Sequence, residues 1–428
     1  MKKTIKKFMQ NPMLIVFLII LIFFTPAAIY SPGQNREKGV VIAIGIDSRD
    51  SEYEISLLTF IPTVQQSYKE MSSVITGKGE SIAKALYNAQ IAMGRQIGLS
   101  HAKTTIVNQE LLKDDVAEYI DYLSRVASLP ENTVFICTDK TAKEILQASF
   151  TLESTVGLQL EQIIGYNAEN LYVTDTSLEA FYKGYYGRQK ASIIGFLSIS
   201  DQEGENMTTT GTSEQSGSSQ VDNGEEQGQN NGDSKSKTSS TGGEESQGQK
   251  NILNKGEAIL LKEGKLAEKL TVDQLNGINL LNSKSKNQII TIYNVDLYGH
   301  MHKLSYRIKN KRINTVTTFE NGSPIYSAQL ILGLELVEVE GEHEHMRVNT
   351  EFSKINSQMR KKLDSKIKRQ FTEAINVLRE NKADVIGISD SFYKSHRKEY
   401  NKFVKEIERE DDFIDFVNFK INLILQAD

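Results

Sequence analysis

The residues whose types and spacing could support metal chemistry are two pairs of histidines. His300 and His302 are two positions apart, as are His343 and His345, which flank Glu344. On a strand this spacing places both rings on one face, where they could share a metal ion. Glycine and charged residues surround both pairs, so we interpret each as a solvated loop of mixed charge. The sequence holds no HExxH, paired CxxC or GxSxG motif, so zinc and acyl-transfer chemistry have no support.

Three other features have both a chemical and a structural interpretation. Ser100 precedes His101, but a nucleophile and its base rarely adjoin in sequence, so we interpret His101 as a structural hydrogen-bonding residue before a strand. Residues 76–79 (TGKG) lack the first glycine and the final Ser or Thr of a phosphate-binding loop, and we predict a turn. Cys137 is the single cysteine and lies in an apolar run, which predicts a core residue. We therefore predict no catalytic, cofactor-binding or metal-binding residue, and a protein that is not an enzyme.

Residues 13–30 (MLIVFLIILIFFTPAAIY) form a long apolar stretch after a basic start that contains no acidic residue. A helix of this length covers about 27 Å, close to the roughly 30 Å of a bilayer core. The stretch is predicted to be a membrane-spanning anchor or a cleaved signal peptide with its site at residues 25–27, and a buried core helix is the remaining alternative. In both cases the basic start stays in the cytoplasm, and we expect everything after residue 30 outside the membrane.

The charge balance narrows the range of partners. The formal net charge is −5, and it becomes −9 when the four lysines of residues 1–12 are set apart. An acidic exterior argues against nucleic acid as a partner and against electrostatic adhesion to anionic lipid. A chain of 428 residues is long enough for two or three domains with cores of their own.

Strand and helix patterns alternate through residues 31–200, which predicts a domain of the α+β or mixed α/β class with a mixed sheet. The expected strands are residues 39–47, 53–61, 103–107, 133–138 and 191–199. The expected helices are residues 81–96, 116–126, 141–148, 158–164 and 178–186. Residues 63–79 are polar, and we expect them to be irregular.

Residues 201–250 separate the two halves of the chain. They are rich in Ser, Thr, Gly, Gln, Asn and Glu and contain almost no apolar residue, so we predict a disordered linker. In the second half, residues 251–428, we expect a hairpin at 258–270, strands at 289–294, 303–308 and 328–339, and a bulge near 336–337. A helix of about thirty residues over 352–378, a strand at 385–388, a helix at 390–407 and a final strand at 413–425 follow.

Basic residues cluster on the polar side of that long helix. We interpret this cluster as a solvated face, with contact to a partner or to lipid headgroups as the alternative. Its members are Lys354, Arg360, Lys361, Lys362, Lys366, Lys368 and Arg369.

Three groups of residues, taken together and in order, resemble the Ger(x)C family, the C subunit of spore nutrient-germinant receptors. The first group is GESI (79–82) with Ala85 and Leu86, LSHAK (99–103), DYLSR (121–125) and AKEIL (142–146). The second is GEAILLKEGKL (256–266), running through residues 270–271 to Gln274, residues 276–277 and Ile278. The third is ADVIGI (383–388), leading to Tyr393, Tyr400 and Phe403.

The resemblance implies a non-enzymatic receptor subunit with about three mixed-sheet domains after its N-terminal membrane segment. These domains would lie on the outer face of the spore inner membrane, beside the membrane-embedded A and B receptor subunits. Ser100, His101 and Lys103 would be structural positions of the family. The resemblance leaves open whether this subunit contacts the small-molecule germinant.

The sequence departs from the family pattern at the membrane junction. Typical members end their signal in a lipidated cysteine, whereas the cysteine here is Cys137, and the chain contains no tryptophan. We therefore favour retention of residues 1–30 as the anchor that contacts the lipid bilayer. The alternative functions are an extracytoplasmic cell-wall hydrolase, which needs a cleft with two carboxylates, and a solute-binding protein, which needs a deep cleft between domains.

Overall fold

A computed structural model describes residues 38–49, 52–60, 72–148, 176–199, 252–253, 256–282, 288–297, 299–340 and 355–427. The expected membrane segment at residues 1–30, the expected helix at 158–164 and the expected linker at 201–250 lie outside these ranges. Within them, no helix has the length and apolar character needed to cross a bilayer.

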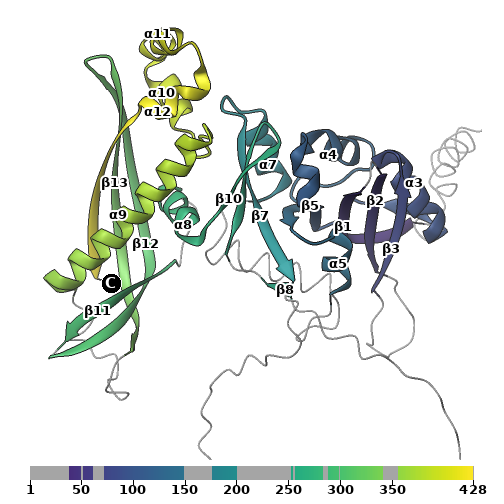
Figure 1. The fold of residues 1–428 in the computed structure, drawn as a ribbon, viewed down its shortest axis with the longest axis horizontal. Coiled ribbons are helices and arrows are strands. Elements are labelled where there is room, and N and C mark those ends of the chain that lie inside the picture. The colour runs from purple at the N-terminus through teal and green to yellow at the C-terminus, as the bar shows by residue number, and fades with distance from the viewer. Residues whose placement is uncertain are drawn as a thin grey trace, which may run out of the picture.

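The described chain forms two lobes that lie side by side (Figure 1). The N-terminal lobe, formed by the described residues between 38 and 270, is built on a ten-stranded mixed sheet whose path runs β10-β9-β7-β6-β5-β1-β2-β3, with β4 beside β1 and β8 beside β7. Its strands are β1 (Lys38–Arg49), β2 (Glu52–Phe60), β3 (Ser72–Gly79), β4 (Gln96–Gly98), β5 (Thr104–Asn108), β6 (Val134–Thr138), β7 (Ala191–Ile199), β8 (Ile252–Leu253), β9 (Ala258–Lys262) and β10 (Lys265–Leu270). The predicted mixed α/β class is confirmed.

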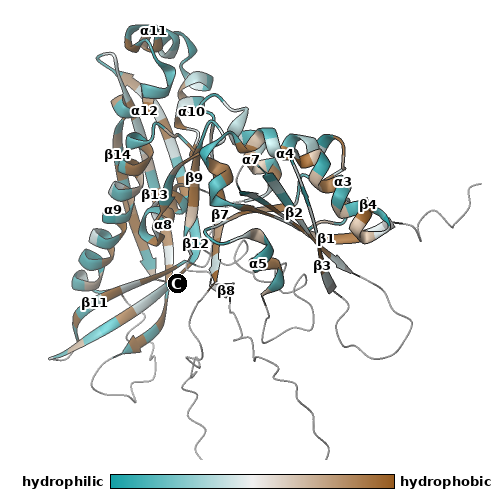
Figure 2. Ribbon diagram, turned by 45° about the vertical axis from the view of Figure 1, so that its right-hand side comes forward, coloured by the Kyte–Doolittle hydropathy of each residue, from teal (hydrophilic) through white to brown (hydrophobic). Residues whose placement is uncertain are grey.

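Helices cover both faces of this sheet, and side-chain caps fix where they begin. One face packs against α3 (Ile82–Met93), α4 (Val116–Arg125) and α7 (Leu178–Tyr185), and the other packs against α5 (Ala142–Gln147). Ser81 caps α3 by accepting a hydrogen bond from the amide of Lys84, and Thr141 and Glu144 form a capping box on α5. Figure 2 shows hydrophobic and hydrophilic residues alternating along these helices, as expected for helices with one buried side.

The prediction that residues 63–79 are irregular is wrong for the part that the structure describes. β3 pairs with β2 in antiparallel register from Ser72 to Gly79, so the TGKG stretch is an edge strand rather than a turn. Its glycines let α3 pack directly on the strand, because a Cβ atom on Gly77 would lie 2.1 Å from the backbone nitrogen of Ala89. Glycine and lysine weakened the strand signal here, although the glycines allow α3 to pack closely on the strand.

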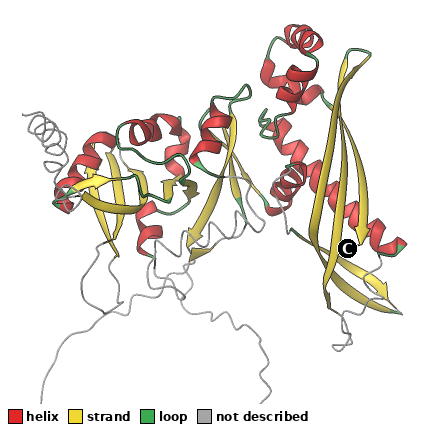
Figure 3. Cartoon of the chain, turned by 180° about the vertical axis from the view of Figure 1, so that it is seen from behind, coloured by secondary structure: helices red, strands yellow, loops and turns green. Residues whose placement is uncertain are grey.

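The C-terminal lobe, residues 272–427, is a four-stranded sheet of order β11-β12-β13-β14 (Figure 3). Its elements are α8 (Val272–Leu281), β11 (Ile289–Leu297), β12 (His300–Glu320), β13 (Ser323–Glu340), α9 (Ser357–Glu380), α10 (Ile388–Ser395), α11 (Arg397–Ile407), α12 (Phe413–Phe416) and β14 (Asn418–Ala427). The bulge predicted near residues 336–337 is confirmed. Ser305 pairs with Glu338 and Tyr306 with Leu336, which leaves Val337 unpaired on β13.

Three expectations for this lobe are wrong or incomplete. The expected strand at 385–388 is a turn that leads into α10, and the expected helix at 390–407 is two helices that meet at His396. The final strand begins at Asn418, because residues 413–416 form the short helix α12. Phe413 and Ile414 are both fully buried, and consecutive residues cannot share one face of a strand. The helix α8 was not foreseen.

The two lobes share hydrophobic packing at strands β7 and β9. Ile194 and Ile259 face the core under α3, α4 and α7, whereas Ile193 and Leu260 belong to the core of the C-terminal lobe. Alternate residues of a strand point to opposite faces, so β7 and β9 contact one hydrophobic core with one face and the other core with the opposite face. The lobes are therefore packed together and not merely connected by chain.

Candidate functional site

The residues considered for chemistry serve structural roles or lie apart from one another. His101 is exposed in the turn before β5, and backbone bonds hold this turn, with Lys103 donating to the carbonyl of Ile42 at 2.7 Å. Cys137 is fully buried, as predicted, and burial raises the pKa of its thiol well above the ordinary range. The thiol is therefore protonated and packed in the core.

The loop predicted for His300 and His302 is wrong. Both residues belong to β12, and His302 is buried with its ring Nδ1 2.9 Å from the carbonyl oxygen of His300. His343 and His345 lie outside the described residues. Over the described ranges, no group of three or more His, Cys, Asp or Glu side chains could hold a metal ion.

The basic cluster on α9 is only partly a solvated face. Lys366 and Arg369 both pair with Asp273, the acidic residue in the first turn of α8, at 2.9 Å. Arg360 donates to the carbonyl of Leu425 at 3.0 Å, and Lys362 donates to the carbonyl of Tyr293 at 3.0 Å. Much of the cluster therefore fixes α9 to α8 and to the sheet, which the sequence pattern alone did not reveal.

The signature ADVIGI (383–388) forms the turn that leads into α10 and ends at the first residue of that helix. Asp384 is buried, and its carboxylate accepts hydrogen bonds from the amides of Gly387 and Ile388, at 2.9 and 3.0 Å, and of Ser389 at 2.7 Å. These three amides are among those that the helix itself leaves without partners. Burial raises the pKa of the Asp384 carboxyl, whereas the three amide bonds act in the opposite direction. Asp384 is a helix cap, which sequence reading did not identify.

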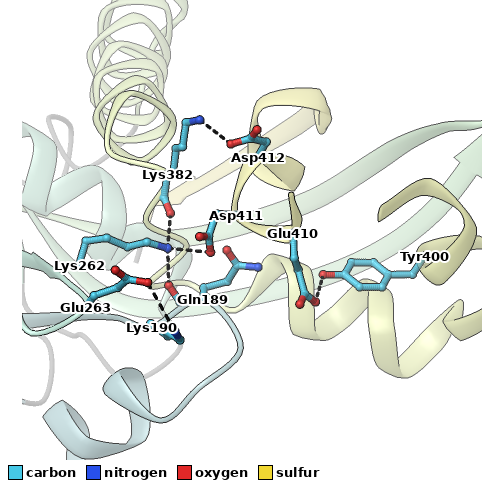
Figure 4. A network of polar contacts seen from close by, with 9 residues as sticks. All are labelled: Gln189, Lys190, Lys262, Glu263, Lys382, Tyr400, Glu410, Asp411 and Asp412. Carbon is cyan, nitrogen blue, oxygen red and sulfur yellow. Dashed lines mark hydrogen bonds and ion pairs between the residues drawn. The ribbon is translucent and has the colours of Figure 1, made fainter. Parts of the chain in front are cut away.

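The most elaborate polar arrangement in the described chain lies where the two lobes meet (Figure 4). Lys262, the last residue of β9, donates to the carbonyl of Gln189 at 2.7 Å, to the carbonyl of Lys382 at 3.0 Å and to the carboxylate of Asp411 at 2.9 Å. Lys382 pairs in turn with Asp412. One ammonium group thus joins the N-terminal lobe to two separate segments of the C-terminal lobe. We call these residues, with Arg188 and its partners below, the joint.

Arg188 forms the second half of the joint. Its guanidinium carbon lies 3.8 Å from the centre of the Tyr393 ring, and its Nη1 atom is 2.7 Å from Glu410. Tyr400 donates its hydroxyl to the same carboxylate at 2.8 Å. Stacking on an aromatic face together with a carboxylate bond is a geometry that arginine offers and lysine does not. Tyr393 and Tyr400, two positions of the family resemblance, therefore bind the arginine that follows α7.

A cleft of about 480 Å³ opens beside the joint, between the end of α7 and the start of α10. Its charged lining residues are already engaged: Arg188 lies 3.4 Å from Asp390, Lys183 pairs with Glu179, and Asp384 caps α10. Such a lining suits the contact between two lobes better than it suits catalysis, which needs acid and base groups with room for a substrate. We identify the joint, rather than an active site, as the candidate functional site.

Comparisons with known proteins also divide the chain into two parts, but their boundary falls before β9, whereas the sheet of the N-terminal lobe continues through β10. Residues 36–199 match the family described as "Spore germination protein N-terminal domain", and residues 255–424 match "Spore germination B3/ GerAC like, C-terminal". The "Spore germination protein KC" of Bacillus subtilis (strain 168) is 20% identical over 406 residues, which cover 91% of this chain and 89% of that protein. The solved "Crystal Structure of the GerBC protein" aligns with a TM-score of 0.46 and 12% identity, covering 90% of this chain and 96% of that one.

Proposed function

Because this chain belongs to the Ger(x)C family of spore germination proteins, we propose that it is the non-enzymatic C subunit of a spore germinant receptor, required for the response to nutrient germinants. The observation that carries the proposal is that both family domains occur in order and together span most of the chain. The subunit works with membrane-embedded A and B subunits at the spore inner membrane.

The roles of the family residues support a receptor subunit that works by binding and not by catalysis. Asp384 caps a helix, while Tyr393 and Tyr400 hold Arg188 across the lobes. Lys262 and Glu263 of the second group lie at the joint and at the turn of the β9–β10 hairpin. Side chains engaged in this way stabilise the arrangement of the two lobes, which is a structural role and not a catalytic one.

We also propose that residues 1–30 are retained and tether the subunit, with its lobes on the outer, extracytoplasmic face. The apolar stretch 13–30 follows a basic start, and no cysteine lies at the junction to carry lipid. The mature protein should then keep its first residues and resist extraction from spore membranes by high salt. A mature amino terminus near residue 28 would contradict the tether and leave the partner subunits to hold the protein.

A clean deletion tests the function. Spores without this protein should fail to respond to one group of nutrients, measured as the fall in turbidity of the spore suspension, while other nutrients still trigger germination. A copy of the gene restored elsewhere should recover the response, and the A and B subunits should co-purify with the restored protein. Normal germination over a broad nutrient panel, with the protein missing from spore membranes, would overturn the proposal.

A further inference from the structure

A second cleft, of about 560 Å³, opens on the N-terminal lobe where α4 begins, α7 ends and the β9–β10 hairpin turns. Its volume falls within the range of about 300–1,000 Å³ that is common for small-ligand sites. Neither the joint nor the family resemblance assigns a role to it. The lining residues are Asp115, Tyr185, Tyr186, Gly187, Lys190, Glu263 and Lys265.

One wall of this cleft is aromatic and held rigidly. The rings of Tyr185 and Tyr186 meet edge to face with their centres 4.9 Å apart, and Tyr186 also stacks on Tyr182 at 6.0 Å. Tyr185 donates its hydroxyl to Asp115 at 2.5 Å and stacks on Phe181, which is fully buried. The Tyr186 side chain is nevertheless 73% exposed. A large ring held in place but left in water is unusual for a residue that serves only the core.

The rim of the cleft is polar and equally fixed. The amide of Glu263 donates to the carbonyl of Lys190 at 2.7 Å, and the Lys190 ammonium lies 3.5 Å from the Glu263 carboxylate. The hairpin turn is bound to α4, since the amide of Val116 donates to the carbonyl of Gly264 at 3.0 Å. Gly264 has a φ of 74°, and a Cβ atom there would lie 1.9 Å from an oxygen of Asp115. These contacts hold the backbone that carries the charged rim in place beside the aromatic wall.

We propose that this cleft binds a glycan, with a pyranose ring lying on the exposed face of Tyr186. A pyranose presents a face of C–H groups, which suits an aromatic ring, and an edge of hydroxyls that both donate and accept hydrogen bonds. The carboxylate of Glu263 can accept from these hydroxyls, and the ammonium groups of Lys190 and Lys265 can donate to them.

The charge distribution favours this ligand over a docked protein. Charged residues are depleted at the cores of protein interfaces, whereas here four of the seven lining residues are charged: Asp115, Lys190, Glu263 and Lys265. The inference is independent of the receptor assignment, because it uses only the geometry of the cleft.

Calorimetric titration of the full chain with three hexasaccharides, chitohexaose, cellohexaose and maltohexaose, tests the proposal. The chain is held in a detergent without a sugar headgroup, because glycoside detergents would compete. Saturable binding of at least one hexasaccharide is expected. The sugar that binds most tightly then shows which ring substituents the polar rim recognises. Failure of all three to bind at millimolar concentration would overturn the proposal.

Variants then locate the binding to this cleft. Tyr186→Ala should weaken binding of the preferred sugar about fivefold, since aromatic stacking contributes on the order of 1 kcal/mol, and Tyr186→Phe should keep the affinity within about twofold. Tyr87→Ala is the matched control, because Tyr87 is also exposed (55%) but lies on α3, away from the cleft. Circular dichroism checks that each variant is folded. Equal losses in Tyr186→Ala and Tyr87→Ala, or no loss in either, would refute the site.

Discussion

Replacing Lys262 by methionine should weaken the joint between the lobes. The Lys262 ammonium donates to two backbone carbonyls, of Gln189 and Lys382, and to the carboxylate of Asp411, at 2.7, 3.0 and 2.9 Å. Methionine keeps the apolar stem at similar length but has no proton to donate. Lys262→Met therefore leaves three oxygens of both lobes without their shared partner and changes little else.

The size of the effect follows from the burial of the pair. Removing one partner of a buried ion pair costs about 3–5 kcal/mol, and a hydrogen bond to a charged group contributes about 1.5–3 kcal/mol. The Lys262 and Asp411 side chains are 18% and 29% exposed, so water replaces part of what is lost. We expect a loss of about 2–3 kcal/mol in the free energy that holds the lobes together.

Hydrogen–deuterium exchange suits this test, because a two-lobed chain need not unfold in one step. Amides of β9 and of residues 410–412 should exchange about 30- to 150-fold faster in Lys262→Met. Lys265→Met is the matched control, since Lys265 lies exposed on the same hairpin. A cycle with Asp411→Asn should give a coupling energy of about 1 kcal/mol. If Lys262→Met exchanges like Lys265→Met, the joint is not what holds the lobes.

Three further predictions concern single residues. Gly77→Ala should lower the unfolding free energy by about 1–3 kcal/mol in urea titrations, because its Cβ would lie 2.1 Å from the Ala89 backbone nitrogen; wild-type stability would contradict the close packing. Asp384→Asn should cost about 1–3 kcal/mol and speed amide exchange at the start of α10, since an amide group cannot accept all three bonds; unchanged exchange there would argue against the cap. Burial raises the pKa of Asp47 to about 6, so the folded state binds the proton of the Asp47 carboxyl more tightly than the unfolded state does. Stability should then fall by about 2–3 kcal/mol between about pH 4 and pH 6, and Asp47→Asn should remove that slope in urea titrations at stepped pH.

Strong periodic patterns in the sequence predicted most of the fold. The strands rich in apolar residues, such as β1 and β7, and the helix α9 with its repeating apolar positions were predicted from sequence. The predictions failed where tertiary contacts, and not the local sequence, determine the secondary structure. β3 uses glycines to admit α3, and residues 413–416 turn into a helix so that Phe413 and Ile414 are both buried. The local sequence pattern gives no information on α3, which packs on β3, or on the core that buries Phe413 and Ile414.

The site was less predictable than the fold, because it depends on distant pairs. Lys262 is separated from Asp411 by 149 positions, and Arg188 from Glu410 by 222. In the sequence, Lys262 is a lone lysine at a strand end and Arg188 a lone arginine after a helix, a pattern typical of solvated charges. The basic cluster of α9 was interpreted that way too, although Lys366 and Arg369 bind Asp273. Only the resemblance to a family directed attention to the residues around Tyr393 and Tyr400.

The arrangement of the joint limits how one lobe can move against the other. Strands β9 and β10 belong to the family's C-terminal match, yet they pair in the sheet of the N-terminal lobe beside β7. A hinge between the lobes cannot lie at the boundary of the two family matches, because chain on both sides of that boundary is in one sheet. Any relative motion must instead occur after β10, around α8, and must break the Lys262 and Arg188 contacts. Separation of the lobes therefore requires the contacts of these two cations to break, and Arg188→Lys, which lacks the stacked guanidinium, should weaken these contacts while keeping the positive charge.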